Sequence, residues 1–330
     1  MWIGLYLILA LSLNLINGCA GMFSLGHQGF WAVGAYGAAA LVVKLPFELP
    51  GPVMFALSLI VGAICATLAG LIIGVPCLRL RGDYLAVATL GFAEIIRNLL
   101  IKFDWLGASR GQRIPPQVLD PQDTAPYHWF YLAVTWFFVL VTVWICRNVI
   151  HSSHGRAILA IREDEVAAEL LGVNVTRYKL LVFLLGSMLA GLAGALHANF
   201  ELYIAPPMFT MLPGIMILLM VVLGGTGSMS GTAIAVVVLY SLQQILKLSL
   251  FGLPTSAASA IGWPPLEALA KSFELLARER WQAMFAVLLV IVMISMPQGI
   301  FGKRELWQTE RFRRWAGRLG FRARTARTGA

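Results

Sequence analysis

A glutamate and an arginine stand inside an apolar stretch of the chain that reads LGFAEIIRNLL. Glu94 and Arg97 are three residues apart, so on a helix they share a face and can neutralise one another. Ionisable side chains are costly inside a membrane and usually mark a function there. The pattern leaves two interpretations: an ion pair that holds a helix bundle together, or a pair that lines or gates a pathway.

A histidine stands among glycines in the string SLGHQGF, between two short apolar segments. Broken helices of this kind often expose backbone groups to a cavity in membrane proteins. His27 is therefore a candidate contact for a substrate or a gate. The alternative is a hydrogen bond from its ring that fixes the turn.

The sequence gives little support for a metal site or a catalytic site. His197 and Glu201 are four residues apart, but a zinc site needs a third protein ligand, so we expect no metal. The sequence contains no GxxxxGK[ST] phosphate-binding loop, and no nucleophile stands at a recognisable spacing from a base. The sequence thus predicts no catalytic residue and no cofactor.

The elements that position these residues must lie in a membrane. Hydrophobic residues make up 59% of the chain and charged residues only 12%, whereas a soluble domain carries roughly 25% charged residues. Asp, Glu, Lys and Arg are missing from long runs, at residues 1–43, 49–78, 124–146, 180–200, 202–246 and 281–302.

Helix length and chain breakers divide these runs into passes. A helix needs about 20 apolar residues to cross the hydrocarbon layer, and breakers at residues 17–29 and 224–231 split the two longest runs. We therefore predict an all-α, polytopic integral membrane protein with about 8–10 transmembrane or half-membrane helices. The expected passes lie near residues 2–17, 28–44, 52–75, 84–101, 129–146, 179–198, 213–224, 231–250 and 282–298.

Basic residues predict the orientation, because cytoplasmic loops retain Lys and Arg. Residues 303–330 carry nine basic residues against two acidic ones, and the loop at 151–179 is also basic. We expect a transmembrane domain at 1–302, followed by a basic cytoplasmic tail at 303–330. Segment 102–128 and the N-terminus would then lie outside. Directly after a membrane helix, such a tail favours binding to anionic lipid headgroups over binding to nucleic acid.

The inner loop at 151–179 reads HSSHGRAILAIREDEVAAELLGVNVTRYK. Ser152, Ser153 and Gly155 can start a helix, residues 156–171 are rich in helix formers, and Gly172 can end it. One helix would carry an apolar stripe of Leu159, Val166 and Leu170. It would either lie along the membrane surface or seat this stripe in the groove of a partner.

The string EVAAELLG in this loop resembles the EAA loop of ABC importer permeases, in which two alanines are followed four residues later by glycine. Ala167, Ala168 and Gly172 match, whereas Glu165 stands one position early. Over about residues 5–300, further strings are similar, in order, to segments of branched-chain amino acid ABC permeases: ALSLNLINGCAGMFSLGHQGFWAVGAYGAA, RLRGDYLAVATLGFAEIIR, GRAILAIREDEVAAELLGVNVTRYKLL, LAGLAGAL and VVLGGTGSMSG. The string DWLGASRGQRIPP likewise resembles the Gly-rich outer loop of that family. They indicate the larger of two permease types that usually form a heterodimer.

The resemblance implies a subunit of an importer in the cell inner membrane. A second homologous permease would complete the pathway, two cytoplasmic ATPase subunits would drive it, and an external, periplasmic binding protein would deliver the cargo. The chain itself would not be an enzyme. The ATPase subunits would contact a coupling loop in which small alanines let the helix seat deeply, through Arg156, Glu165, Ala167, Ala168 and Gly172.

The sequence leaves alternatives open for the cargo and for the class of transport protein. The resemblance favours leucine, isoleucine and valine, yet similar permeases carry urea, amides and other small organic solutes. A self-sufficient secondary transporter or channel would need its own ion-coupling site, and carboxylates inside the apolar segments are sparse. Such a protein would also leave the amphipathic inner loop unexplained.

Overall fold

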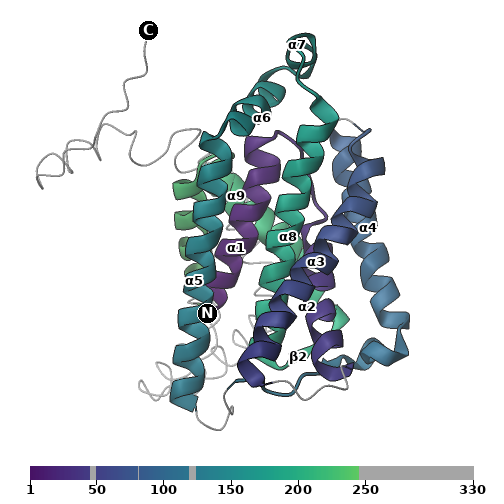
Figure 1. Ribbon diagram of the computed structural model, residues 1–330, viewed down its shortest axis with the longest axis vertical. Coiled ribbons are helices and arrows are strands. Elements are labelled where there is room, and N and C mark those ends of the chain that lie inside the picture. The colour runs from purple at the N-terminus through teal and green to yellow at the C-terminus, as the bar shows by residue number, and fades with distance from the viewer. Residues whose placement is uncertain (45–49, 81, 119–123, 245–330) are drawn as a thin grey trace, which may run out of the picture.

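The protein is described by a computed structural model over residues 1–44, 50–80, 82–118 and 124–244. Within these ranges it is a bundle of helices with long axes roughly parallel (Figure 1). In chain order the helical elements are α1 (Trp2–Asn14), a π-helix (Leu15–Cys19), α2 (His27–Lys44), α3 (Gly51–Cys77), α4 (Asp83–Lys102), α5 (Thr124–His151), α6 (Ser153–Glu163), α7 (Glu165–Leu170), α8 (Val175–Glu201), α9 (Met211–Gly224) and Met229–Gln244.

The polytopic helical fold predicted from the apolar runs is confirmed. Among the described residues, six helices are long and apolar enough to cross a membrane. Each expected pass from 2–17 to 213–224 coincides with one helix, and Met229–Gln244 covers most of the pass expected at 231–250. The pass expected at 282–298 and the tail at 303–330 lie outside the described residues, as does the boundary between the two expected domains.

Helix α2 lies at the centre of the bundle, packed against α3, α8 and α4. Its backbone comes very close to that of α8, because Gly34 and Gly191 face one another without side chains. A Cβ added to Gly62 of α3 would lie 2.7 Å from the Gly34 carbonyl oxygen. Small residues permit this close packing in a membrane, where dispersion contacts replace the hydrophobic effect between helices.

The two ends of the bundle differ. Helices α6 and α7 project beyond it at one end, and a short sheet lies at the other (Figure 1). In that sheet β1 (Gln112–Arg113) pairs antiparallel with β2 (Tyr203–Ile204). The sheet ties the segment after α4 to the segment after α8, opposite the loop of α6 and α7.

Candidate functional site

The loop at 151–179 forms two helices, so the prediction of one continuous helix over residues 156–171 is wrong. The Ser152 hydroxyl caps α6 by accepting a bond from the Gly155 amide, at 3.1 Å. The chain then breaks at Asp164, whose φ of −154° and ψ of 113° are extended. The Asp164 carboxylate accepts bonds from the amides of Val166 and Ala167, at 2.9 and 3.0 Å. Capping by this side chain starts α7 as a separate helix.

The break also divides the expected apolar stripe. Ala168 is buried against Ile161 and Val175, so this alanine fills the inside of the loop and does not open its outer surface. The outer surface of α7 instead carries three apolar side chains, and the most exposed are Leu170 at 84% and Leu171 at 83%. Large apolar groups exposed together mark interaction sites. The third is Val166.

The remaining loop residues hold the two helices onto the bundle or face outward. Glu165 pairs with Lys179 at 2.8 Å and so ties α7 to the start of α8. Gly172 has a φ of +82°, the left-handed conformation expected for the residue that ends the helix. Arg156 and Ala167 are exposed.

Arg162 joins the loop to the membrane-spanning part of the chain. Its guanidinium donates a hydrogen bond of 3.0 Å to the carbonyl oxygen of Gly18, and it also contacts Glu163 at 2.8 Å. Gly18 belongs to the π-helix that continues α1, and π-helical turns are frequent at functional sites. No pattern in the sequence singles out Arg162 as a functional residue. A contact across 144 positions leaves no local signal in the chain.

The same end of α1 holds the glycine-rich turn after α9. The amide nitrogen of Asn14 donates to the Ser228 carbonyl at 3.1 Å, and its oxygen accepts from the Gly227 amide at 2.8 Å. Asn14 is buried, and its bond to the Ser228 carbonyl lies away from water. Arg162, the π-helix and the turn at 225–228 therefore form one connected set, which we call the hinge cluster.

His27 begins α2 and is buried. Its Nε2 lies 2.8 Å from the Ser12 hydroxyl on α1, which in turn donates to the Leu9 carbonyl. The geometry agrees with the alternative in which the ring fixes the turn between the two helices. A role in a gate stays a prediction, and it would require the two helices to separate.

Glu94 and Arg97 form an ion pair on α4, with the Arg97 Nε 2.7 Å from the Glu94 Oε2. Their side chains are 33% and 25% exposed. They belong to neither the loop nor the hinge cluster, and their helix packs against α2, which His27 begins.

We expect Glu94 and Arg97 to depend on one another. Glu94→Ala and Arg97→Ala should each lower the amount of folded protein in the membrane, because each leaves one charge without its partner. The double variant should lose less than the sum, with a coupling energy of about 0.5–3 kcal/mol. Thermal unfolding of the detergent-purified variants measures this difference. Additive losses would show that the two charges act independently.

His197 is a buried histidine whose surroundings the sequence analysis did not anticipate. Its ring lies between those of Trp2 and Trp31, with centroid distances of 5.0 and 5.2 Å, and Phe209 closes a third side at 5.9 Å. The surrounding aromatic rings come from α1, α2 and the segment before α9. The packing joins these elements near the end of the bundle that holds the short sheet.

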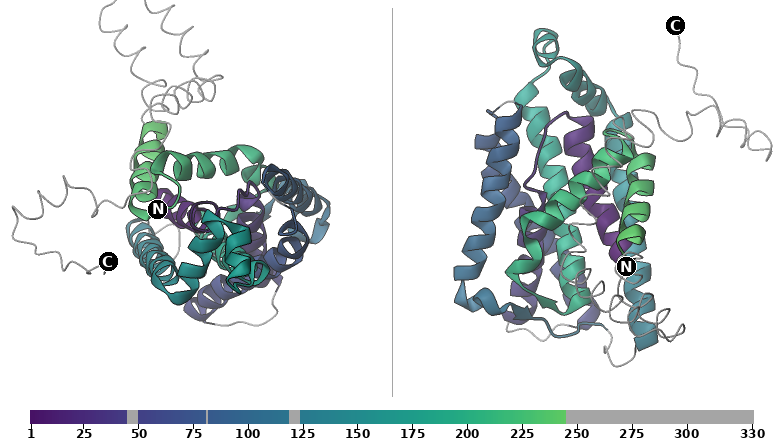
Figure 2. Two further views of the ribbon diagram at one scale, coloured as in Figure 1. Left: turned by 90° about the horizontal axis from the view of Figure 1, so that it is seen from above. Right: turned by 180° about the vertical axis from the view of Figure 1, so that it is seen from behind.

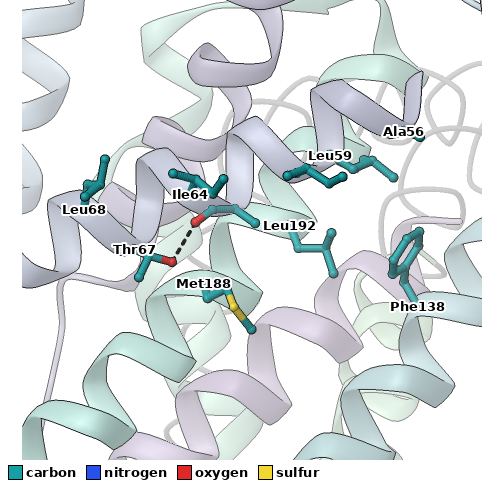
Figure 3. A pocket seen from close by; sticks show the side chains of 10 residues that line it. Ala56, Leu59, Ile64, Thr67, Leu68, Phe138, Met188 and Leu192 are labelled. Atoms are coloured by element: carbon teal, nitrogen blue, oxygen red, sulfur yellow. Dashed lines mark hydrogen bonds between the residues drawn. The ribbon is translucent and has the colours of Figure 1, made fainter. Parts of the chain in front are cut away.

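An apolar groove with a volume of about 580 Å³ runs between α3, α5 and α8 (Figure 3). The one hydroxyl in its lining, that of Thr67, already donates to the Ala63 carbonyl at 2.8 Å. Such a groove suits hydrocarbon and offers nothing to an ammonium or carboxylate group. Its other lining residues are Ala56, Leu59, Ile60, Ile64, Leu68, Phe138, Met188 and Leu192.

Comparison with known proteins gives the chain a consistent set of relatives. Residues 1–296 match the family described as "Branched-chain amino acid transport system / permease component". The chain is 34% identical over 272 residues to the high-affinity branched-chain amino acid transport system permease protein LivM of Salmonella typhimurium. That alignment covers 74% of this chain and 61% of the Salmonella protein. No solved structure matches the chain.

Two further relatives extend the pattern. The probable branched-chain amino acid transport permease protein LivM of Methanocaldococcus jannaschii is 23% identical over 339 residues, which cover 93% of both chains. The permease protein LivH of Escherichia coli, from the high-affinity system, is 31% identical over 156 residues, or 47% of this chain and 42% of LivH. The chain is thus similar to two permeases with different names.

Proposed function

Because the chain belongs to the family of permease components of branched-chain amino acid transport systems, we propose that it is a permease subunit of an ATP-driven importer. The expected cargo is leucine, isoleucine and valine, in line with the printed names of the relatives in Salmonella and Escherichia coli. The chain would provide part of the membrane pathway and would itself hydrolyse nothing. It would span the cell inner membrane several times, with its C-terminus in the cytoplasm.

The partners follow from the same proposal. A second, homologous permease would complete the pathway, as the likeness to both LivM and LivH suggests. Two cytoplasmic ATPase subunits would bind the loop of α6 and α7, and an external binding protein would approach the opposite end. Membrane lipids would contact the outer surface of the bundle and the basic tail.

The observation that carries the proposal is the hydrogen bond from Arg162 to the Gly18 carbonyl. A loop that only lay on the membrane surface would have no need of a charged bond into the end of a membrane helix. Through this bond, a pull on α6 reaches the π-helix and, by way of Asn14, the turn at 225–228. The geometry therefore supports a coupling loop that transmits movement from ATPase subunits to the membrane helices.

Uptake of labelled amino acids by cells that lack this chain tests the proposed function. Deletion should abolish leucine, isoleucine and valine uptake, and restoring the chain should restore it. The uptake should persist when a protonophore collapses the proton gradient while ATP is maintained, and it should need the external binding protein. Uptake driven by an ion gradient would favour a secondary transporter. Loss of urea or amide uptake alone would change the assigned cargo.

A pair of serine-to-cysteine variants tests the orientation. Ser153 at the start of α6 and Ser109 in the segment after α4 are both exposed, and they lie on loops at opposite ends of the bundle. An impermeant thiol reagent should label Ser109→Cys in intact cells and Ser153→Cys only after permeabilisation. The four native cysteines are buried or half-buried, which keeps the background low. The reverse labelling pattern would overturn the proposed topology.

Substitutions at Gly172 test whether the left-handed backbone conformation at the end of α7 matters for docking. A Cβ there would meet nothing within 4 Å, so only its φ of +82° disfavours a side chain. Gly172→Val should distort the end of α7, at a cost of roughly 1–2 kcal/mol, and lower the co-purification of the ATPase subunits. Gly172→Asn is the matched control, because asparagine tolerates left-handed backbone. Equal co-purification by both variants would mean that this conformation does not matter for docking.

A further inference from the structure

The outward face of α4 differs in its amino-acid composition from the exposed faces of α3 and α5. Helix α4 lies at the edge of the bundle in all three views (Figures 1 and 2). Its buried side packs mainly on α2. Its exposed side, which we call the α4 face, centres on Gly91 and carries Tyr84, Val87, Glu94, Ile95, Asn98 and Leu99.

Two polar side chains, those of Glu94 and Asn98, stand at membrane depth on the α4 face. Glu94 lies about 12 Å from one end of α4 and about 16 Å from the other, at a rise of about 1.5 Å per residue. Its side chain is 33% exposed despite its pairing with Arg97. Asn98, one turn further along, is exposed. Hydrocarbon cannot satisfy a carboxylate or an amide, so side chains of this kind normally face protein or water within a membrane.

Gly91 supplies an independent observation. It stands in the middle of α4, is exposed, and has nothing within 4 Å of the position that a Cβ would take. A helix gains about 1 kcal/mol from alanine in place of glycine at such a site, and no packing within the described part of the chain explains the glycine. Glycine on an open face of a membrane helix allows another helix to approach closely.

The exposed faces of α3 and α5 provide the contrast. Between Val53 and Val75, every exposed residue of α3 is apolar, and the same holds for α5 between Trp129 and Trp144. These two faces have the composition expected for contact with lipid. The α4 face breaks that rule at Glu94 and Asn98, so lipid is a poor match for it.

We propose that the α4 face is the surface on which the second, homologous permease subunit packs, with Glu94, Arg97 and Asn98 enclosed between the two chains. The inference rests on the proposed function, which supplies that subunit. Of the proposed partners, only a membrane-spanning chain reaches residues at this depth, since the ATPase subunits and the binding protein are confined to water. The described part of this chain ends at Gln244, across the bundle from α4 (Figure 2).

Photo-crosslinking in native membranes tests the surface with a matched pair of isoleucines. Ile95 on the α4 face is 53% exposed and Ile64 on α3 is 51% exposed. With p-benzoylphenylalanine at either position, ultraviolet light should join residue 95 to the second permease, identified by mass spectrometry, and leave residue 64 joined only to lipid. Residue 140 on α5, also exposed, serves as a further control.

Other crosslinking results would overturn either the assignment of the α4 face or the assigned occupant. Adducts with the second permease from residue 64 or 140 but not from residue 95 would show that this subunit packs on another face of the bundle. The proposed two-permease importer would still hold. An adduct with residues 245–330 of this chain, or with a second copy of it, would overturn the assigned occupant. Absence of any permease adduct at all three positions would overturn the α4 face, and co-purification of the second permease with this chain would then show whether the two-permease assembly holds.

A substitution at Gly91 provides a second readout. Gly91→Leu adds bulk where this chain has open space, so the single chain should insert and accumulate normally. Co-purification of the second permease should fall about tenfold, because overpacking a close helix contact is unfavourable. Ala133→Leu, at an exposed position of α5, should leave co-purification unchanged. Equal recovery of the second permease with both variants would overturn the proposal.

Discussion

Replacing Arg162 with alanine should sharply reduce transport while the ATPase subunits remain bound to the permease. The guanidinium is the hydrogen-bond link from α6 to the π-helix, through the Gly18 carbonyl. Hydrogen bonds to charged groups contribute roughly 1.5–3 kcal/mol. If this bond carries the coupling, its loss should reduce transport about 10- to 150-fold. Docking should persist, because the exposed leucines of α7 are unchanged.

The measurement compares substrate uptake with ATP hydrolysis in the same proteoliposomes. Arg162→Ala should retain binding of the ATPase subunits and lose the link between hydrolysis and uptake. Glu163→Gln is the matched control, since it weakens the neighbouring ion pair and leaves the bond to Gly18 in place. Transport at the wild-type level in Arg162→Ala would show that the hinge cluster takes no part in coupling.

The hinge cluster is also the part of the site that the sequence predicted least well. Residues 17–29 were recognised as breakers of a long apolar run, which placed the end of the first pass at residue 17, between the end of α1 at Asn14 and the end of the π-helix at Cys19. That Gly18 would accept a bond from Arg162, and Asn14 would hold the Gly227 turn, depends on the packing of distant segments. Local patterns carry no record of such contacts.

Helix positions were easier to predict, for a physical reason. The hydrocarbon layer imposes a minimum length and excludes charge, so apolar runs and their breakers located the passes to within a few residues over most of the described chain. The loop was harder. Residues 156–171 favour a helix throughout, yet the Asp164 side chain binds the amides of Val166 and Ala167 and outweighs that preference.

The split at Asp164 changed the expected docking surface as well. Because α7 starts anew after the break, Ala168 turns inward against Ile161, whereas Leu170 and Leu171 turn outward. The motif resemblance located the loop, and the alanines within it suggested a close-fitting surface. Only the structure shows which of its side chains are available to a partner.

Aspartate at Leu170 and Leu171 together should therefore eliminate ATPase docking. Burying a leucine side chain contributes about 1.5–3 kcal/mol, so losing two from the contact costs about 3–6 kcal/mol, or two to four orders of magnitude in affinity. The fold of the chain should survive, because both side chains are more than four-fifths exposed and stand at the end of α7, the helix that projects furthest from the bundle (Figure 1).

Co-purification of the ATPase subunits with the double variant gives the measurement, and thermal unfolding of the isolated permease confirms that the fold is intact. Glu169→Ala is the control on the same helix, because it alters an exposed residue beside the leucines without removing apolar area. The double variant should lose substrate-stimulated ATP hydrolysis together with docking, whereas Arg162→Ala should lose only the coupling to uptake. Normal docking by the double variant would show that α7 does not contact the ATPase subunits, and the coupling surface would have to lie elsewhere on the chain.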